Sequence, residues 1–367
     1  MSRSRLVVRY ALALLVLAMF VAPSCGAGFD PPSKVNTLRV LGVTIDKPYA
    51  LPGEEVTFRM TVADGLGNAD GEPRDLQIAW IGGCSNPDSD LWFLCFEQLA
   101  EQFQSLAGGG LPPDGLVAVT LASGTSSGLP DAHEYSLTLP DDIVSSRPVP
   151  DLGPHYGLAI VFYAVCAGSL APANLDSLAA SSDGSQLTLP LECLDESGNR
   201  LGAESFVIGF TQAYAFADSR GNDNPPIDGM EFSAQPWSDD LTQVPIVPPC
   251  PVSEADRKQG GCATEGLDSC EGYVVKALVG DVAEVDPDAF TPEGVPFREV
   301  VWVNYFADSG DIEDFTKLVS DAELGYLGEH ETLWYAPPEP ALVTVWAVAR
   351  DQRGGQTVVR RFIRVQE

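Results

Sequence analysis

Residues 54–64 read EEVTFRMTVAD, and this stretch decides the fold class. Apolar residues occupy every second position in it, namely Val56, Phe58, Met60 and Val62. Successive side chains of a β-strand point to opposite faces, so a period of two predicts a strand with one buried face and one face in water. The turn sequence LPG before it and the polar run DGLGNADGEPRD after it bound this strand.

Similar segments recur along the whole chain. Further strand candidates are 37–45, 76–82, 116–122, 134–139, 156–166, 205–217, 229–234, 271–280, 298–307 and 333–336. The chain closes with ALVTVWAVARD at 341–351 and QTVVRRFIRV at 356–365, a predicted hairpin through DQRGG. Short strands separated by Gly, Pro and Asp turns predict an all-β chain that forms an antiparallel sandwich or barrel.

One segment departs from this pattern. Residues 90–110 read DLWFLCFEQLAEQFQSLAGGG, with apolar residues at spacings of three and four and a glycine stop at 108–110. The spacing predicts a helix with Asp90 as its N-cap. It lies in an insertion at 84–115, and we expect it to pack over one sheet face. A helix that binds a partner is the alternative.

The two halves of the chain share a signature. AYAFAD leads into Asp218 and Arg220, and WAVARD leads into Asp351 and Arg353, so each half has D-x-R-G after an apolar strand. Each half also places a tryptophan in the middle of a strand, at Trp80 and Trp302, as suits a sandwich core. We therefore expect two related domains, 35–221 with the helical insertion and 229–367 with a cysteine-containing insertion at 237–270, joined by a linker at 222–228.

Three stretches carry a resemblance to a known family: PGEEVTFRMTVADG, VVWVNYFADSGDIEDF and the terminal LWYAPPEPALVTVWAVARDQRGGQTVVRRFIRV. They resemble the immunoglobulin-like or PKD-like domains of uncharacterised lipoproteins from myxobacteria and their relatives. The resemblance covers the flanks of both units and leaves the insertions out. It implies two immunoglobulin-like β-sandwich modules on a lipid tether, and it implies no activity, since a sandwich fold does not specify function.

The N-terminus has the layout of a signal peptide. Arg3, Arg5 and Arg9 precede the apolar run ALALLVLAMFV at 11–21, which is too short to span a membrane. Cleavage of 1–24 would make Cys25 the first residue, followed by a tether at 25–34. APSC resembles a bacterial lipobox, although Ala22 stands where Leu is usual and Pro23 where Ala or Ser is usual. We expect lipid attachment at Cys25 and a place at the outer membrane or cell surface; a periplasmic or secreted protein is the alternative.

The chain is strongly acidic. It has 21 Lys plus Arg against 52 Asp plus Glu, a formal net charge of −31, and loss of the signal peptide removes three more positive charges. Such a surface repels a polyanion over a Debye length of about 8–10 Å. Nucleic acid is therefore excluded as an expected partner.

The cysteines fit an oxidising compartment, where they tend to pair. Beyond Cys25 there are seven: Cys84, Cys95, Cys166, Cys193, Cys250, Cys262 and Cys270. Local spacing suggests bridges Cys84–Cys95 and Cys166–Cys193, with a third bridge from the last three. Seven is an odd number, so one cysteine stays unpaired within the chain if Cys25 is lipidated.

The sequence offers few candidate catalytic residues. The three histidines, His133, His155 and His330, lie far apart in the sequence, which gives no support to a histidine metal site or triad. The G-x-S-x-G match at 124–128, with Ser126 at its centre, lies between two strand candidates and reads as a flexible loop. No carboxylate pair stands out among the 52 acids.

Calcium is the metal that the sequence leaves open. Asn222, Asp223 and Asn224, followed by two prolines, resemble the calcium-binding linker between cadherin repeats, but Arg220 stands where that pattern has an acidic ligand. A proline-stiffened acidic linker is the simpler reading. A second acidic cluster in ADSGDIEDF, at 307–315, lacks the spacing of a helix-loop-helix calcium site.

Together these observations predict a cell-envelope lipoprotein, not an enzyme, that works in adhesion, scaffolding or ligand binding. Its expected partners are the membrane, through the lipid, and an envelope protein or a glycan. We keep two alternatives, a secreted hydrolase directed at carbohydrates or esters, and a calcium-stiffened adhesin. A binding module should expose an aromatic patch, and we expect it around Leu91, Trp92 and Phe93.

Overall fold

Each of the long strands described in the structure lies where a strand is predicted, whereas several shorter strands, β19 (Thr316–Asp321) among them, are not predicted. The computed structural model describes residues 30–67, 74–95, 122–125, 133–172, 191–218, 220–253 and 270–367. Within these ranges the regular structure consists of β-strands and two short 3-10 turns, Asp88–Asp90 and Trp92–Leu94. The all-β prediction is confirmed. Within the same ranges, no helix is long and apolar enough to cross a membrane.

The N-terminal sandwich consists of two sheets. One has the order β1 (Leu38–Ile45), β3 (Glu55–Asp64), β6 (Glu134–Thr138). The other has the order β2 (Tyr49–Ala50), β10 (Phe206–Phe216), β7 (Tyr156–Cys166), β4 (Asp75–Ser85), β5 (Ala122–Thr125). A small separate ribbon pairs β8 (Ser169–Pro172) with β9 (Leu191–Leu194). Pairing is antiparallel except between β2 and β10, which run parallel.

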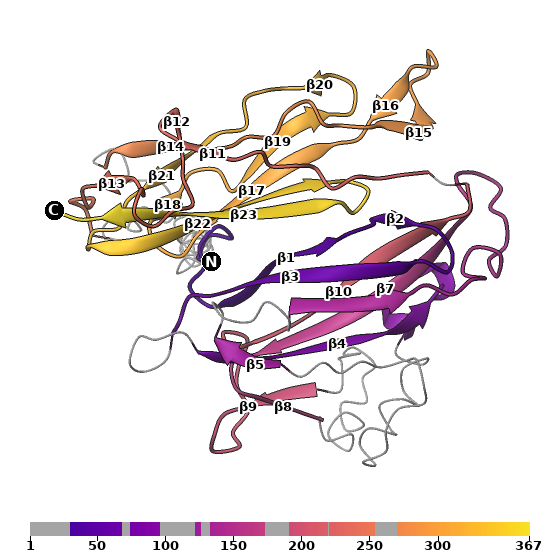
Figure 1. Cartoon of the computed structure of the whole chain (residues 1–367), viewed down its shortest axis with the longest axis horizontal. Helices are drawn as coiled ribbons and strands as arrows, with labels where there is room; N and C mark the ends of the chain where they lie inside the picture. The colour runs from indigo at the N-terminus through magenta and orange to yellow at the C-terminus, as the bar shows by residue number, and fades with distance from the viewer. Residues whose placement is uncertain are drawn as a thin grey trace, which may run out of the picture.

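The C-terminal sandwich also has two sheets. One has the order β12 (Gln235–Pro236), β11 (Met230–Phe232), β14 (Gly272–Ala277), β21 (Thr332–Tyr335), β18 (Asp311–Ile312). The other has the order β13 (Ile246–Val247), β23 (Gln356–Val365), β22 (Ala341–Asp351), β17 (Val301–Ala307), β19 (Thr316–Asp321), β20 (Gly325–Tyr326). A two-stranded ribbon of β15 (Val285–Phe290) and β16 (Pro296–Arg298) projects at one end (Figure 1).

The core of the N-terminal sandwich follows directly from the alternation in β3. Val56, Phe58, Met60 and Val62 are buried between the two sheets, whereas the intervening residues face outward. Trp80 of β4 lies opposite them and stacks on Tyr135 of β6, with ring centroids 5.8 Å apart. This burial of large apolar side chains is the main source of stability for such a pair of sheets.

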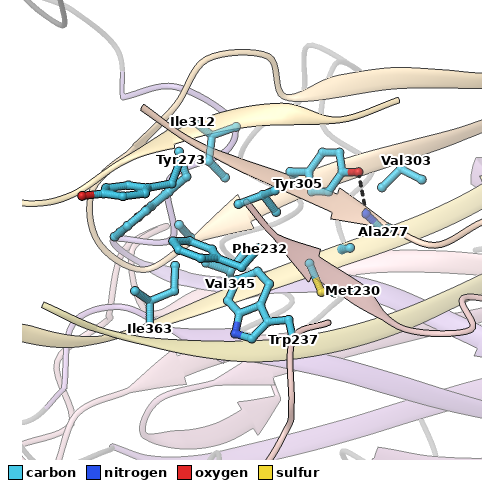
Figure 2. Packing of buried hydrophobic residues seen from close by; sticks show 14 of the residues in the cluster. Met230, Phe232, Trp237, Tyr273, Ala277, Val303, Tyr305, Ile312, Val345 and Ile363 are labelled. Atoms are coloured by element: carbon cyan, nitrogen blue, oxygen red, sulfur yellow. Dashed lines mark hydrogen bonds between the residues drawn. The ribbon is translucent and has the colours of Figure 1, made fainter. Parts of the chain in front are cut away.

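The core of the C-terminal sandwich is organised around Tyr305 (Figure 2). Its hydroxyl donates to the carbonyl oxygen of His330 at 2.8 Å and accepts the N–H of Ala277 at 3.0 Å. A buried hydroxyl costs free energy unless it is hydrogen-bonded, and here both roles are filled. Trp334 and Phe232 fill the centre of the same core.

The expected equivalence of Trp80 and Trp302 is wrong. Trp302 is only half-buried and lies outside the C-terminal core, because Val301, Val303 and Tyr305 take the inward positions of β17. The period of two then directs Trp302 to the opposite face. Trp334 of β21 takes the central position instead, with no exposed surface.

The two sandwiches meet face to face, which gives four stacked sheets (Figure 1). We call this contact the junction. Its apolar cluster joins Val35, Leu41 and Ala63 to three residues of the C-terminal sandwich, Phe306, Trp346 and Val348. β22 is therefore buried on both faces, since Val343, Val345 and Ala347 point into the C-terminal core.

Hydrogen bonds to backbone groups add to the junction. Asn224 lies between the sandwiches: its Nδ2 donates to the carbonyl oxygen of Ile45 at 2.7 Å, and its Oδ1 accepts the N–H of Gln356 at 2.8 Å. At the other end, Val35 N–H donates to the carbonyl oxygen of Ala307 at 2.8 Å. Ser33 and Lys34, the end of the predicted tether, thus lie against β17.

The prediction of a helix that begins at Asp90 is wrong for its first turn. Residues 84–94 turn back on themselves through two 3-10 turns because the Cys84–Cys95 disulfide brings its Cα atoms to 5.5 Å. Asp90 caps no helix; its carboxylate accepts the hydroxyl of Tyr156 and pairs with Arg147. The remainder of that predicted helix, from residue 96, lies outside the described residues, as does most of the strand predicted at 116–122.

Candidate binding cleft at the junction

A cleft opens beside the junction, between β10 and the turn that joins β22 to β23. Its volume is about 290 Å³. One wall consists of Phe210, Thr211, Gln212 and Tyr214, and the other of the turn at 350–356. We call it the junction cleft.

The turn is held by the carboxylate of Asp351. Its Oδ1 accepts the backbone N–H groups of Arg353 at 2.7 Å and Gly355 at 2.8 Å. Gly354 has a φ of 100°, which favours glycine, and a Cβ on Gly355 would come within 2.1 Å of the Asp351 carboxylate. Burial raises the pKa of Asp351, while these N–H donors act in the opposite direction.

Arg353 of the D-x-R-G stretch lines the cleft, and its guanidinium is paired with two carboxylates. Its Nε donates to Oε2 of Glu299 at 2.8 Å, and its Nη2 pairs with Glu284. Glu299 is almost fully buried, and burial raises the pKa of its carboxyl. Arg353 also lies 5.4 Å from the ring centroid of Tyr49, within the range of a cation–π contact. The charge of Arg353 is therefore compensated by neighbouring groups of the protein.

The two D-x-R-G stretches converge on one pair of aromatic rings. Arg220 pairs with Asp218 and lies 4.7 Å from the ring centroid of Phe216. Phe216 and Tyr49 are themselves 4.5 Å apart, and Arg353 lies over the far ring. Both stretches thus support the same end of the junction, a role that their sequence similarity alone did not predict.

The β10 wall carries exposed apolar side chains. Phe210 stacks on Trp92 with ring centroids 5.3 Å apart, and each has 37% of its surface exposed. Ile208, two residues along β10, is 40% exposed. Trp92 is positioned by the short loop that the Cys84–Cys95 disulfide closes. The aromatic patch expected near Leu91, Trp92 and Phe93 therefore lies at the edge of the junction cleft.

The residues predicted for calcium lie in the linker, where two of them bond to the sandwiches. Asn222 Nδ2 donates to the Asp351 carboxylate at 3.3 Å, and Asn224 bonds β1 and β23 as described above. The side chain of Asp223 is exposed. In the described part of the chain, no group of three or more His, Cys, Asp or Glu side chains is placed to hold a metal ion.

Three disulfides are present in the described residues. Cys84–Cys95 and Cys166–Cys193 are the pairs that local spacing suggests, and the third is Cys250–Cys270. Cys25 and Cys262 lie outside the described residues, as does Ser126 of the G-x-S-x-G match. The described part of that match, Gly124 and Thr125, lies at the end of strand β5 (Ala122–Thr125).

The three histidines remain apart and each contacts a backbone carbonyl oxygen. The partners are Met60 for His133, Arg147 for His155 and Ala277 for His330. Burial lowers the pKa of both His133 and His330.

Comparisons with known proteins assign no family. No protein-family model matches the chain, and no curated protein matches it in sequence. Among solved structures, the D00-D0 domain of intimin aligns at 11% identity and a TM-score of 0.21, over 90% of this chain and 99% of that one. The fibronectin(III)-like modules of CbhA from Clostridium thermocellum align at 10% identity and a TM-score of 0.20, over 90% and 94%. Latent PorU from Porphyromonas gingivalis aligns at 11% identity and a TM-score of 0.21, over 91% of this chain and 24% of that one. At such TM-scores the similarity carries no argument, and the fold assigned above rests on the sheets and cores of this chain.

Proposed function

We propose that this protein is a lipid-anchored cell-envelope protein, not an enzyme, that presents a binding surface at the junction of two immunoglobulin-like domains, 35–221 and 229–367. The work we assign to it is adhesion or scaffolding through a bound ligand. The lipid is attached to Cys25, and the place is the outer membrane or cell surface.

The observation that carries the proposal is the junction itself. An apolar cluster and the two hydrogen bonds of the Asn224 side chain join the two sandwiches. A surface that spans two modules keeps its shape only if the modules are fixed relative to one another, and these contacts favour that. The exposed Trp92 and Phe210 beside the cleft are of the residue type that dominates binding energy at interfaces.

The charges at the cleft support binding over catalysis. The carboxylate of Asp351 accepts backbone N–H groups, and Arg353 is paired with Glu284 and Glu299. Arg350 donates to Asn304 and to the carbonyl oxygen of Leu41. A general acid or base needs to reach a substrate proton, and these groups are committed to the protein. The three disulfides are consistent with an oxidising compartment outside the cytoplasm.

The anchor is tested by expressing the chain with a labelled fatty acid in a Gram-negative host, alongside Cys25→Ala. We expect label on the unmodified chain and none on the variant. Equal label on both, or label on neither, would contradict the lipid anchor.

The binding surface is tested with a photo-crosslinking residue at Gln352, which is exposed on the cleft, in cells that naturally make the protein. The control carries the same residue at Leu324, which is 78% exposed on β19–β20. We expect a discrete adduct from position 352 that position 324 does not form. Identical adduct patterns would contradict a function located at the cleft.

A further inference from the structure

We propose that the free edge of β10 binds an extended peptide segment of a partner protein by adding it to the sheet as a further strand. The inference rests on the proposed function and names the class of ligand that the junction cleft takes.

The first observation is that β10 is paired unequally on its two sides. All of Phe206–Phe216 pairs with β7. On its other side, within the described residues, the ladder partners of β10 are limited to Tyr49 and Ala50 of β2, which pair with Tyr214 and Ala215. The stretch from Phe206 to Gln212 is thus a sheet edge, the part of a sheet that can accept another strand.

The second observation fixes which backbone groups face that edge. The N–H of Tyr214 donates to the carbonyl oxygen of Pro48, so it points away from β7 and toward β2. Backbone groups alternate in direction along a strand with the same period of two as side chains. The N–H and C=O groups of Ile208, Phe210 and Gln212 therefore point the same way, toward the edge.

The third observation is that this edge borders a space. Phe210 and Gln212 line the junction cleft of about 290 Å³, with the turn at 350–356 on its far side. β2 ends the occupied part of the edge, and the free part continues from it in the same sheet. A bound strand would therefore extend a pairing that the chain already makes with its own β2.

The side chains around the edge indicate which peptide side chains would fit there. Ile208 and Phe210 lie on the outer face of the sheet, with Trp92 stacked on Phe210. A strand added here would place every second side chain over them, so we expect apolar residues at alternate positions. The free edge of seven residues from Phe206 to Gln212 spans roughly 20 Å, so a peptide of about seven residues fills it.

Gln212 offers a matched pair of variants. Gln212→Pro removes the N–H that faces the edge, and proline is tolerated in a strand where its nitrogen faces outward. Gln212→Ala loses the same side chain and keeps the N–H. Both are compared with the unmodified full chain for retention of fold by circular dichroism and thermal unfolding.

The experiment selects binders from a random heptapeptide library on the unmodified protein and measures the affinity of a selected synthetic peptide by fluorescence anisotropy. We expect Gln212→Pro to weaken binding at least tenfold and Gln212→Ala to stay within threefold. Equal affinities for the two variants, or a selection that yields no binder, would overturn strand addition.

A second measurement leaves the protein unchanged and so does not depend on the folding of Gln212→Pro. Two copies of the peptide are N-methylated at alternate positions, one at odd and one at even residues. Strand addition requires one copy to lose binding at least tenfold and the other to keep it, because a strand bonds its neighbour through alternate residues. Equal binding of the two copies overturns the inference.

The failures of the two proposals are distinguishable. An oligosaccharide that binds at the cleft when no peptide is selected would overturn strand addition and leave a ligand-binding cleft in place. If position 352 forms no specific adduct while a selected heptapeptide still binds along β10, the proposed function is overturned and strand addition stands.

Discussion

Arg353 is the residue at which the structure gives the sharpest prediction. Its guanidinium lies between Glu299 and Glu284, and its side chain is 8% exposed. The Glu299 side chain is 2% exposed, so Arg353→Met leaves a buried carboxylate without its cation. The methionine retains the length of the side chain and removes the charge.

The expected cost follows from that burial. Removing one partner of a buried ion pair destabilises a protein by about 3–5 kcal/mol, because the remaining charge is left uncompensated. Glu284 is 34% exposed and adds little to this. We therefore expect Arg353→Met to lower the free energy of unfolding by about 3–5 kcal/mol at pH 7.

The deficit should depend on pH with a definite sign. Burial already raises the pKa of Glu299, and loss of Arg353 raises it further. At a pH between the unfolded and folded pKa values the folded state holds a proton that the unfolded state has released. The deficit is therefore largest at neutral pH and shrinks as the pH falls toward the ordinary range of glutamate.

The assay is urea unfolding of four proteins: the unmodified chain, Arg353→Met, Glu299→Gln and the double variant. Glu299→Gln removes the charge that Arg353→Met leaves buried, so the double variant should recover at least half of the lost stability. A loss below about 1 kcal/mol for Arg353→Met, the value of a surface pair, would refute the reasoning. A double variant no more stable than Arg353→Met would refute it equally.

Three further predictions concern stability. Burial raises the pKa of Asp308 to about 6. Asp308→Asn should therefore stabilise the protein by about 1–3 kcal/mol at pH 7, measured by urea unfolding. This gain should disappear toward pH 4, because the carboxyl of the folded protein is then neutral. Trp346→Ala empties the junction cluster and should cost about 3–5 kcal/mol in denaturant unfolding, whereas Leu324→Ala, at a site 78% exposed, should stay within about 0.5 kcal/mol. Replacing Cys166 and Cys193 by alanine opens a loop of 27 residues and should cost about 3–4 kcal/mol, measured by thermal unfolding against the chain with its disulfides intact. An unchanged melting temperature in the last case would contradict a stabilising bridge.

Apolar patterning predicted the long strands because each buries at least one face in a core. The predictions at 54–64, 156–166, 341–351 and 356–365 match β3, β7, β22 and β23 to within one residue. It did not predict β13, β18 or β20, since two residues hold no period. It was wrong at Trp302, where residue type suggested the core and the phase of the strand placed the side chain on the other face.

The sequence of β22 also carries a signal of the junction. The run VTVWAVA at 343–349 is apolar at almost every position, a pattern typical of a strand buried on both faces. Trp346 and Val348 are indeed buried in the junction, opposite to Val345 and Ala347. The exposed patch at Trp92 was predicted, but not its place beside β10.

The sequence by itself determined the all-β class, the hairpin through DQRGG and two local disulfide pairs, because each depends on residues close together in the chain. The tertiary structure alone decided the partners of Arg353, the hydrogen bonds of Asn224 and the junction cleft. These contacts join residues that lie 54–179 positions apart, and no local period encodes them. They arise when two sandwiches, each shaped by its own core, bring their outer faces into contact.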